Sequence, residues 1–544
     1  MLSLPDNFNV ATHFVDRNVQ EGRGSSIAIE CGDERVTYQQ LLENTNRVGH
    51  ALLALGVRPE ERVLLLLLDT PDFLYSFFGA IKIGAVAVPV NTQARPQDYE
   101  YMLNDSRARV AVVSEPLLSH LESIPQERLR YLQEIVVSEV PRESPSPAQR
   151  SAVHHSLRAL MDSASCRLEP ALTSKDEPAF WLYSSGSTGP AKGCVHLHHD
   201  MVVCCELYAK GILKMNESDR CLSVARLFFA YGLGNAGYFP LGCGATAILN
   251  PARPKPAGIY ADIERYKPTL LFSVPTNFAA LLAHHREDGR EFDLSSVRQA
   301  ISAGEALPAP LFHRFRERFG VEILDSLGST ETLQMVIANR PGEARPGSSG
   351  KIIPGYEARL VDEQGNHVAV NEIGDLLIKG ESTCSGYWNK HDRSTATFVG
   401  EWFRTGDKYS QDADGYFWYA GRANDLFKVN GLWLSPTEVE SALISSPAVC
   451  EAAVVAREDS DGLVKPAAFV VLHGDFRASE PLAQELRALV REKIGGYKQP
   501  HWIEFVAEIP KTATGKLQRF KLREMQGREA AAGRGKSAQT NSAT

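Results

Sequence analysis

The chain has 544 residues, of which 43% are hydrophobic and 23% charged, a composition typical of a folded protein with two to four domains or subdomains. Its formal net charge of −8 argues against a nucleic-acid partner and leaves small anions as better candidates. The N-terminus lacks the features of a signal peptide and the longest apolar run, at residues 63–68, is too short to span a membrane, so we expect a cytoplasmic protein without a membrane partner.

The first segment that suggests chemistry is YSSGSTGPAKG, at residues 183–193, directly after the apolar run AFWL. Its glycines let backbone N–H groups approach a ligand, its hydroxyls donate hydrogen bonds, and Lys192 adds a positive charge. The spacing does not match a P-loop, because Lys192 is followed by Gly193 and not by serine or threonine. Taken alone, the segment suits either a polyphosphate site or a flexible surface turn.

The next segment, HLHHD at residues 196–200, has the ligand density of a zinc site. Because it follows the phosphate-like segment so closely, we favour the start of a helix there over a metal site. The nine cysteines have irregular spacings without a CxxC pair, which favours free thiols over metal or redox roles.

Predicted strands and helices alternate through the middle of the chain. Apolar runs at residues 269–274, 298–303 and 321–326 predict strands, and the segments between them predict helices. Strand, helix and strand in this order predict an α/β sheet with parallel pairing, in which ligands bind beyond the carboxyl ends of the strands. The polar segments that follow predicted strands are SSGSTG after AFWLY, GEALP after ISA, and LGSTE after ILDS.

From about residue 421 the pattern changes to β, α, β, β, α, β over about a hundred residues, which predicts one small α+β domain. Its first helix is expected to begin at the N-cap Ser435, with Pro436 in the first position and Glu438 reaching back in a capping box. The tail from residue 527 is small and polar and lacks a core pattern, so we expect it to be disordered.

Seven segments, in the expected order and over nearly the whole chain, resemble the signatures of the adenylate-forming acyl/aryl-CoA ligases. Besides YSSGSTGPAKG they are KIGAVAVPVN (82–91), SAGEALP (302–308), LGSTE (327–331), RTGD (404–407), GRANDLFKVNGLWLSPTEVE (421–440) and PKTATGK (510–516). The resemblance implies an α/β fold with a large N-terminal adenylation domain at residues 1–423, whose mixed, largely parallel sheets are sandwiched by helices. It also implies a small mobile α+β lid domain at residues 424–526, which leaves residues 527–544 as the disordered tail.

The resemblance further implies an enzyme that uses ATP and Mg²⁺ to convert a carboxylic acid into its acyl-AMP and then transfers the acyl group to CoA, releasing AMP and pyrophosphate. Glu331 would ligate Mg²⁺ and Thr330 would contact the α-phosphate. The residues implied on the β- and γ-phosphate side are Ser184, Ser185, Gly186, Ser187, Thr188, Gly189 and Lys192. The residues implied around adenosine are Gly304, Glu305, Ala306, Asp325, Ser326, Leu327, Gly328, Asp407 and Arg422, with Asp407 accepting from both ribose hydroxyls.

By the same resemblance, Lys516 is the catalytic lysine that reaches from the small domain to the substrate carboxylate and the α-phosphate, where charge develops. The small domain then rotates, which removes the lysine and brings the Gly431 loop, with Lys428, to the pantetheine arm of CoA. The hinge position is Asn424, where the family commonly has Asp. Asparagine tolerates unusual backbone dihedrals, so we still expect a hinge there.

The substrate acid is suggested by segments that resemble the benzoate-CoA ligase branch, which includes 2-aminobenzoate and hydroxybenzoate ligases. These segments are NVATHFVDRNVQEGRG (9–24), LFFAYGLGNAGYFPL (227–241) and GSTETLQM (328–335). An aromatic wall would stack on a flat ring, although the same run could be plain core. Thr332 and Gln334 could bond an ortho-amino or hydroxyl group, and Gln334 stands where many benzoate-type ligases are expected to have histidine. The residues implied in the aryl pocket are Phe229, Ala230, Tyr231, Ala303, Thr332 and Gln334.

Three alternatives share this framework: a stand-alone enzyme that loads an aryl group onto a carrier protein, a luciferase-like oxidation of the adenylate, and a catalytically silent binding module. No fused carrier domain is predicted from the sequence. The silent module is disfavoured because Lys192, Glu331, Asp407, Arg422 and Lys516 are all present. The ring substituents and the oligomeric state, a homodimer included, are left open.

Overall fold

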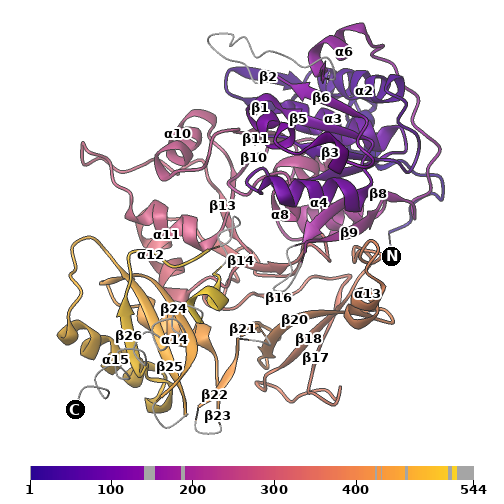
Figure 1. Ribbon diagram of the computed structural model, residues 1–544. Coiled ribbons are helices and arrows are strands. Elements are labelled where there is room, and N and C mark those ends of the chain that lie inside the picture. Colours follow the sequence, from indigo (N-terminus) through magenta and orange to yellow (C-terminus); the bar gives the residue numbers. More distant parts are fainter. Residues whose placement is uncertain are drawn as a thin grey trace, which may run out of the picture.

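The computed structural model describes residues 2–139, 154–184, 190–422, 425–429, 432–459, 463–511 and 517–523. The predicted disordered tail at residues 527–544 lies outside this part of the chain, and the predicted domain boundaries stay predictions. Figure 1 shows a large part built from the N-terminal and central sequence and a smaller part built from the C-terminal sequence. Among the described residues, no helix has the length and apolar character needed to cross a bilayer.

The first sheet contains strands β3 (Arg62–Leu66), β4 (Val86–Pro89), β5 (Val110–Ser114), β6 (Glu134–Ser138), β7 (His154–Ser156), β8 (Pro178–Ser184) and β9 (Lys192–Leu197). Their order is β7-β6-β5-β3-β4-β8-β9. Neighbours pair in parallel except at the edge, where β9 runs antiparallel to β8. The central strands consist largely of buried valine, leucine and alanine, as expected for a parallel sheet covered on both faces.

The second sheet contains β1 (Ile27–Cys31), β2 (Glu34–Thr37), β10 (Arg220–Ser223), β11 (Thr246–Leu249), β12 (Leu270–Ser273), β13 (Gln299–Ser302), β14 (Ile323–Gly328), β15 (Met335–Ala338) and β16 (Lys351–Ile352). Their order is β16-β15-β14-β13-β12-β10-β11-β1-β2. The predictions of strands at residues 269–274, 298–303 and 321–326 are confirmed as β12, β13 and β14, which pair in parallel. The polar segments after β13 and β14 therefore lie at the same edge of the sheet.

Helices cover these sheets. The longer ones are α2 (Tyr38–Ala54), α3 (Pro71–Lys82), α4 (Pro96–Ser106), α10 (Pro256–Tyr266), α11 (Pro275–Ala283) and α12 (Ala309–Phe319). In α12, Leu311, Phe312 and Phe315 are buried, which confirms the predicted apolar face. Short helices are η1 (Thr12–Asp16), α1 (Arg17–Gln20), η2 (Glu115–Leu117), α5 (Leu118–Glu122), η3 (Gln126–Arg128), α6 (Leu157–Ser163), α7 (Asp200–Cys204), η4 (Cys205–Lys210), α8 (Ala230–Leu233), η5 (Gly234–Tyr238) and α9 (Phe239–Cys243).

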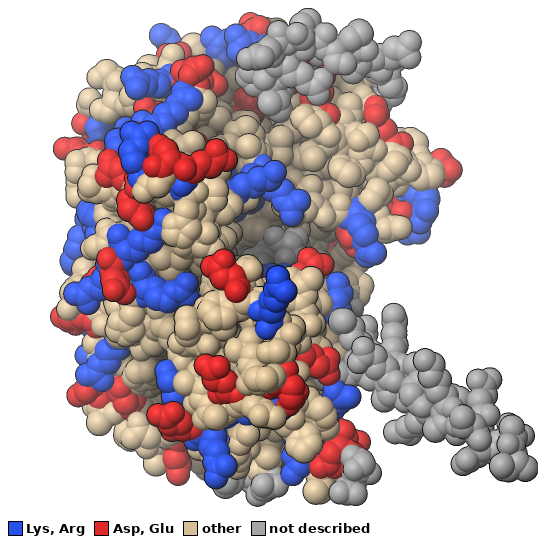
Figure 2. Space-filling view, turned by 90° about the vertical axis from the view of Figure 1, so that its left-hand side faces the viewer, with Lys and Arg blue, Asp and Glu red and all other residues tan. Residues whose placement is uncertain are grey.

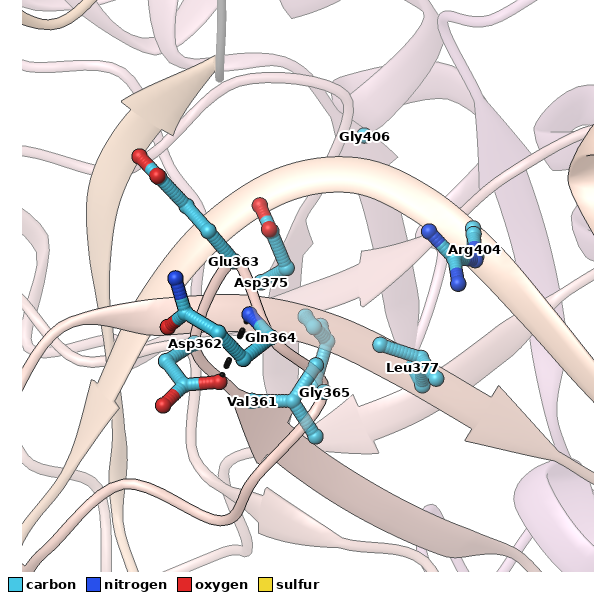
Figure 3. Close-up of a pocket in the computed structure, with 10 residues that line it drawn as sticks. Val361, Asp362, Glu363, Gln364, Gly365, Asp375, Leu377, Arg404 and Gly406 are labelled. Carbon is cyan, nitrogen blue, oxygen red and sulfur yellow. Dashed lines mark hydrogen bonds between the residues drawn. The ribbon is translucent and has the colours of Figure 1, made fainter.

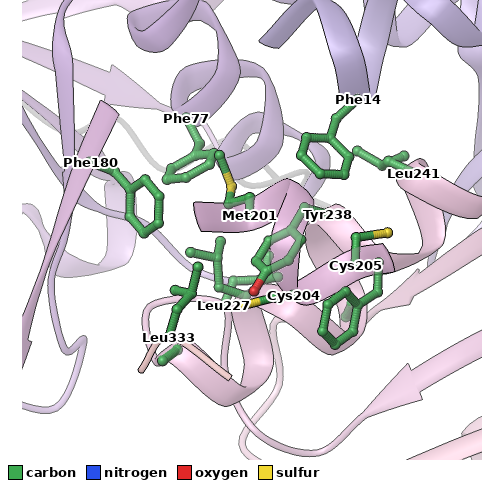
Figure 4. Packing of buried hydrophobic residues seen from close by; sticks show 14 of the residues in the cluster. Phe14, Phe77, Phe180, Met201, Cys204, Cys205, Leu227, Tyr238, Leu241 and Leu333 are labelled. Atoms are coloured by element: carbon green, nitrogen blue, oxygen red, sulfur yellow. The ribbon is translucent and has the colours of Figure 1, made fainter. Parts of the chain in front are cut away.

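The main core brings together side chains from elements that are far apart in the sequence. Figure 4 shows Phe14 and Phe77 from the first hundred residues beside Met201 and Tyr238, with Leu333 at the edge of the same cluster. All five side chains are fully buried. The core therefore extends to the segment that directly follows the LGSTE motif.

An antiparallel sheet follows, made of β17 (Glu357–Val361), β18 (Gly374–Lys379), β19 (Phe398–Val399), β20 (Trp402–Gln411) and β21 (Phe417–Arg422), with α13 (His391–Thr397) beside it. The motif RTGD lies within β20. Because β20 and β21 are paired, Asp407 lies directly opposite Arg422. Figure 2 shows that Lys and Arg are interspersed with Asp and Glu over one face of the molecule, which is hollowed near its middle.

The small C-terminal part contains β22 (Phe427–Val429), β23 (Leu432–Leu434), α14 (Pro436–Ile444), β24 (Val449–Glu458), β25 (Val464–Leu472), α15 (Glu480–Ile494), η6 (Gly496–Lys498) and β26 (Trp502–Phe505). The predicted α+β character is confirmed, but the predicted order lacked one strand, because β22 and β23 form a hairpin before the first helix. The Ser435 hydroxyl accepts from the Glu438 N–H, 3.4 Å, as predicted. The expected capping box is wrong, because the Glu438 carboxylate pairs with Lys498 instead of reaching back.

Candidate active site

Glu331 is the point at which three separate segments meet. Its Oε1 accepts hydrogen bonds from the Ser184 hydroxyl at the end of β8, 3.2 Å, and from the Tyr387 hydroxyl, 2.8 Å. Its backbone oxygen accepts from the Cys384 N–H, 2.8 Å. Burial, and then the neighbouring Glu331 carboxylate, raise the pKa of Tyr387, so the phenol stays protonated and donates. The structure thus joins the start of the phosphate-like segment to the LGSTE motif.

The carboxylate of Glu331 fits the chemistry of a magnesium ligand. Both hydrogen bonds that it accepts go to Oε1, so that Oε2 has no hydrogen-bond donor within the described part of the chain. Mg²⁺ prefers carboxylate oxygens and retains several waters, so one well-placed carboxylate beside a phosphate site is enough to recruit it. When bound there, the ion would offset the negative charge of ATP.

Lys192, at the start of β9, lies over the ring of Tyr387, with 4.1 Å from Nζ to the ring centroid. Tyr387 thus contacts both a predicted phosphate ligand and the predicted magnesium ligand. The next residue, Trp388, anchors this segment: its N–H donates to Gly193 O, 2.9 Å, and its ring lies 4.6 Å from that of Trp181 in β8. Arg62 lies near both indole rings, at 5.6 and 5.5 Å.

The HLHHD segment supports the site from inside the protein. The two ring nitrogens of His196 lie 2.7 Å from Asp200 Oδ2 and 2.8 Å from the backbone oxygen of Thr330, and both side chains of the pair have no exposed surface. Since a carbonyl only accepts, Nε2 carries a proton, and Nδ1 shares a second one with the Asp200 carboxylate. His196 lies in β9, and the helix predicted to begin in this segment is confirmed as α7, which begins at its last residue, Asp200.

Asp407 and Arg422 form an ion pair between neighbouring strands. Arg422 Nε lies 2.8 Å from Asp407 Oδ1, and Asp407 is almost fully buried. The Asp407 carboxylate raises the pKa of Arg422 further above its ordinary value, against the effect of burial. An ionised carboxylate only accepts hydrogen bonds, which is what two ribose hydroxyls would require of Asp407.

The residues predicted around adenine lie at the ends of β13 and β14. Gly304, Glu305 and Ala306 follow one residue after the end of β13, and Asp325 to Gly328 form the end of β14. Burial raises the pKa of Asp325 well above its ordinary value, opposed by the Leu307 and Ser326 N–H groups. Gly328 permits a close approach of chains, because a Cβ there would lie 2.6 Å from the backbone oxygen of Gln334.

The predicted aryl wall, residues 229–231, leads into the short helix α8. The Tyr231 hydroxyl donates toward the backbone oxygens of Ser273, 3.2 Å, and Ile301, 3.0 Å, which ties the ring to the ends of β12 and β13. Phe229 is partly buried, with its ring 4.2 Å from that of Phe228, and Ala303 is buried at the end of β13. The structure therefore brings these residues to the same edge of the sheet as the adenine segments.

Thr332 and Gln334 differ in what they offer to a ligand. The Thr332 hydroxyl donates to Gln334 O, 3.0 Å, and accepts from the Ser329 N–H, 3.2 Å, so its hydrogen bonds hold the turn together. Gln334 Nε2 donates to the backbone oxygens of Ala230, 2.6 Å, and Tyr231, 3.2 Å. The amide of Gln334 therefore ties the LGSTE segment to the aryl wall.

A hollow beside the RTGD motif does not belong to this site. It is lined by Arg404 and Gly406 of that motif and by residues 361–365 and 375–377 (Figure 3). Two of its three acidic side chains have partners: Asp362 Oδ1 accepts from the Gln364 N–H, 2.9 Å, and Asp375 pairs with Lys408, also at 2.9 Å. An acidic lining disfavours the phosphates of ATP.

Several predicted site residues lie outside the described part of the chain: Ser185, Gly186, Ser187, Thr188, Gly189, Asn424, Gly431 and Lys516. Lys428 lies in β22. The neighbours of Lys516 and Asn424 are described, and they are connected. Arg519 bonds both carboxylate oxygens of Glu440 in α14 at 2.7 Å, and Arg523 pairs with Asp425. The stretch after the predicted catalytic lysine is thus tied to the residue after the predicted hinge.

Sequence reasoning missed Tyr387 and the supporting role of His196 and Asp200. The signal for the pair was the spacing of four residues within HLHHD, which places a histidine and a carboxylate near each other. The signal for Tyr387 was weaker, an aromatic pair within the sequence SGYWNK. Neither pattern indicates contact with LGSTE, because that contact depends on how distant segments pack.

Comparisons with known proteins agree with this geometry. A family model described as "AMP-binding enzyme" matches residues 15–388, and one described as "AMP-binding enzyme C-terminal domain" matches residues 438–516. The chain is 46% identical over 524 residues to the benzoate–CoA ligase of Thauera aromatica, covering 96% of this chain and 97% of that protein.

Two solved structures are similar over almost the whole chain. The anthranilate CoA ligase AuaEII, in complex with anthranoyl-AMP, has a TM-score of 0.91 and 43% identity, covering 97% of this chain and 99% of that one. A benzoate CoA ligase from Burkholderia xenovorans LB400 has a TM-score of 0.85 and 42% identity, covering 95% and 100%. Family membership implies the use of ATP and CoA. The chain therefore belongs to the AMP-binding enzyme family and, within it, to the benzoate–CoA ligase branch of AMP-forming acid–thiol ligases.

Proposed function

We propose that the enzyme activates benzoate, or a small substituted benzoate such as 2-aminobenzoate, as the acyl-AMP and transfers the acyl group to CoA, releasing AMP and pyrophosphate. The observation that carries the proposal is the junction at Glu331, where Ser184 and Tyr387 converge on one carboxylate oxygen and Lys192 lies beside them. A carboxylate is a poor acyl donor until it is joined to AMP, and that step requires the charge of the phosphates to be offset. The junction supplies a cation, hydroxyl donors and a magnesium ligand together.

Five of the predicted residues have the following roles in this proposal. Lys192 serves as counter-charge to the pyrophosphate that leaves. Ser184, the last residue of β8, donates a hydrogen bond to the same phosphates. Thr330 contacts the α-phosphate, and its backbone is positioned by His196. Asp407 accepts from the ribose hydroxyls, and Lys516 stabilises the charge that develops at the α-phosphate and the carboxylate.

The aromatic acid is supported by the wall at residues 229–231. Tyr231 is fixed by two backbone acceptors and faces the ring of Phe272 edge-on, with centroids 6.4 Å apart, so it forms a rigid surface. Rigid aromatic surfaces favour flat rings over long alkyl chains. Similarity to a ligase solved with anthranoyl-AMP and to two benzoate ligases supports the same substrate class.

The two half-reactions are proposed to use two arrangements of residues 1–423 and 424–526, with Asn424 as the hinge. The first presents Lys516 to the adenylate site, and the second brings Lys428 and Gly431 to the pantetheine arm of CoA. The ion pairs that join Arg519 to Glu440, and Arg523 to Asp425, support movement of this part as a unit.

A substrate screen tests the proposal. Pyrophosphate release is measured with benzoate, 2-aminobenzoate, hydroxybenzoates and a fatty acid of eight carbons, each with and without CoA, and thioester products are identified by mass spectrometry. We expect release with the benzoates and aryl-CoA as the product. Preference for the fatty acid contradicts the aryl pocket. Release without any CoA thioester favours carrier-protein loading, and no release with any acid favours a silent binding module.

A further inference from the structure

Ser382, in the segment that follows β18, donates a hydrogen bond to the turn that carries Glu331. Its hydroxyl lies 2.9 Å from the backbone oxygen of Thr332 and 2.7 Å from the Tyr356 hydroxyl, and the three side chains are buried. A carbonyl oxygen only accepts, so the single hydroxyl hydrogen of Ser382 is used on Thr332 O, and the Tyr356 hydroxyl must donate to Ser382 Oγ. The three groups thus form a hydrogen-bond chain with one direction, from Tyr356 through Ser382 to Thr332.

The donor end of this chain is held in place by packing. Tyr356 lies directly before β17, and burial raises the pKa of its phenol well above the ordinary value, so the hydroxyl keeps its hydrogen. Its ring lies against the backbone of Gly380, where a Cβ would come within 2.1 Å of the ring atom Cδ1. The Cys204 thiol lies 3.9 Å from the same hydroxyl and is a weak hydrogen-bond partner. Ser382 is therefore the main acceptor for Tyr356 within the described part of the chain.

Two further contacts join the segment after β18 to Glu331. The Cys384 N–H donates to Glu331 O and the Tyr387 hydroxyl donates to Glu331 Oε1, both at 2.8 Å. Residues 382–387 thus hold both the backbone and the carboxylate of the proposed magnesium ligand. A shift of this segment would move that carboxylate relative to the phosphates of ATP, and reaction rates are sensitive to misplacement by as little as about 1 Å.

We propose that Ser382 is a positioning residue for the activation step and that Tyr356 acts through it. The Ser382 hydroxyl is bonded to Thr332 and Tyr356 and its side chain has no exposed surface, so it acts through the turn and not by touching the substrate. The aryl ring and the adenine are proposed to bind elsewhere, at residues 229–231 and at the ends of β13 and β14. Loss of the Ser382 hydroxyl should therefore slow the reaction of the bound complex without weakening the binding of ATP or the acid.

The test rests on the proposed function and compares variants of the whole chain. Adenylation is measured by ATP–pyrophosphate exchange with the acid that the wild type uses best, so that the choice of acid does not decide the outcome. Ser382→Ala removes the donor to Thr332 O, and we expect kcat to fall by about 10-fold while KM for ATP and for the acid stays within about 2-fold of wild type. Tyr356→Phe leaves that donor in place and should lower kcat by about 3-fold. A wild type that forms no adenylate with any acid overturns the proposed function and the inference with it.

The double variant separates positioning from stability. Ser382→Ala leaves the buried Tyr356 hydroxyl without its main acceptor, which should lower the midpoint of denaturant unfolding. Adding Tyr356→Phe removes that hydroxyl, so the midpoint should return toward the wild-type value while kcat stays as low as in Ser382→Ala alone. A kcat that recovers together with the midpoint would show that Ser382 only supports the fold. A raised KM with an unchanged kcat would show that it affects binding, and either result overturns the inference.

Tyr38→Phe is the matched control. The Tyr38 hydroxyl is also buried and also donates to a backbone oxygen, that of Ala245, 2.6 Å, in the loop before β11. Its loss should lower the unfolding midpoint and leave kcat for adenylation unchanged. If Ser382→Ala does not fold, Tyr356→Phe decides, because an unchanged kcat in that variant overturns the inference.

Discussion

Different kinds of contact stabilise the proposed adenylate site and the small C-terminal part. Around Glu331 the contacts are short hydrogen bonds to backbone or to one carboxylate oxygen, as with His196 on Thr330 O and Tyr387 on Oε1. Beside the proposed hinge the contacts are ion pairs, as between Arg519 and Glu440. Hydrogen bonds to backbone atoms and to a single oxygen position individual side chains, whereas the bidentate pair of Arg519 with Glu440 ties the helix α14 to the stretch after the proposed lysine.

This difference suits an enzyme with two half-reactions. The phosphates and the aryl group need the same surroundings throughout, so their site is built into the core of the large domain. In the proposed mechanism the lysine of the first step must leave before CoA arrives, and the described stretch after it is tied by ion pairs to Glu440 and to Asp425, the residue after the proposed hinge. Changes in the first region should therefore affect both half-reactions, and changes in the second should separate them.

The largest effect is expected for Lys516→Ala. Removing a group that stabilises developing charge should lower the rate of adenylate formation by about a thousand-fold. Thioester formation from preformed aryl-AMP should remain, because the lysine is absent from that step. Rapid-quench measurement of each half-reaction checks this. Lys511→Ala is the matched control, because Lys511 lies five positions before Lys516 in the sequence and forms an ion pair with Glu451 of β24. Equal losses in both half-reactions contradict the proposed role of Lys516.

Asp200→Ala should be the most damaging change to the fixed region. It leaves the fully buried His196 without its charged partner, which should lower the free energy of unfolding by about 4 kcal/mol and slow both half-reactions. Denaturant unfolding measures the first effect and half-reaction kinetics the second. Asp176→Ala is the control, since Asp176 is 62% exposed in its pairing with His199 and should change stability by less than about 1 kcal/mol. Loss of only one half-reaction would contradict the expectation that both half-reactions depend on the region around Glu331.

Arg519→Gln should destabilise the small domain by about 3 kcal/mol, since it leaves Glu440, which is 7% exposed, without its main partner. Burial lowers the pKa of Arg519, but the carboxylates of Glu440 and Asp425 act in the other direction and the pKa of the guanidinium is raised. We expect faster hydrogen exchange across α14 and a loss confined to adenylation. Arg487→Gln, in a pair with the exposed Glu480, is the control. Unchanged exchange in α14 would mean that the ion pair does not hold this helix.

The smallest effect is expected for Tyr387→Phe. The ring stays beneath Lys192, and only the hydrogen bond to Glu331 is lost. The apparent affinity for Mg²⁺·ATP should fall by about 5-fold, and both half-reactions should keep their maximal rates. Tyr387→Leu, which also removes the cation–π contact, should lower affinity for ATP further. Identical behaviour of the two variants would assign the whole effect to the hydroxyl.

The fold was predictable where local pattern and tertiary role agree. The runs that became β12, β13 and β14 are apolar throughout, and α12 shows its buried face in the sequence. The first hairpin of the small domain was missed because β22 and β23 have three residues each, too few to show a period. The capping box failed because Lys498, sixty positions away, competes for Glu438.

The site was predictable as a set of motifs but not as a set of contacts. Glu331, Lys192 and Asp407 are recognisable from the sequence around them, and the structure brings Lys192 to the ring and Glu331 to the hydroxyl of Tyr387. No sequence motif marks Tyr387, because its role arises from packing against Lys192 and Glu331, which lie on distant segments of the chain. Likewise, the sequence presents Thr332 and Gln334 as equals, and only their hydrogen bonds show that one hydroxyl is occupied while one amide oxygen is free of described donors.

The neighbouring, tilted indoles of Trp181 and Trp388 should give this enzyme an optical signal of its own. Trp388 is adjacent in sequence to Tyr387. The indole rings of Trp181 and Trp388 lie 4.6 Å apart, and the Arg62 guanidinium is close to both. Indole emission responds to nearby charge and to small changes in stacking. Arrival of ATP at Lys192 and departure of pyrophosphate should therefore alter the fluorescence of this pair, so that each turnover can be followed without a label.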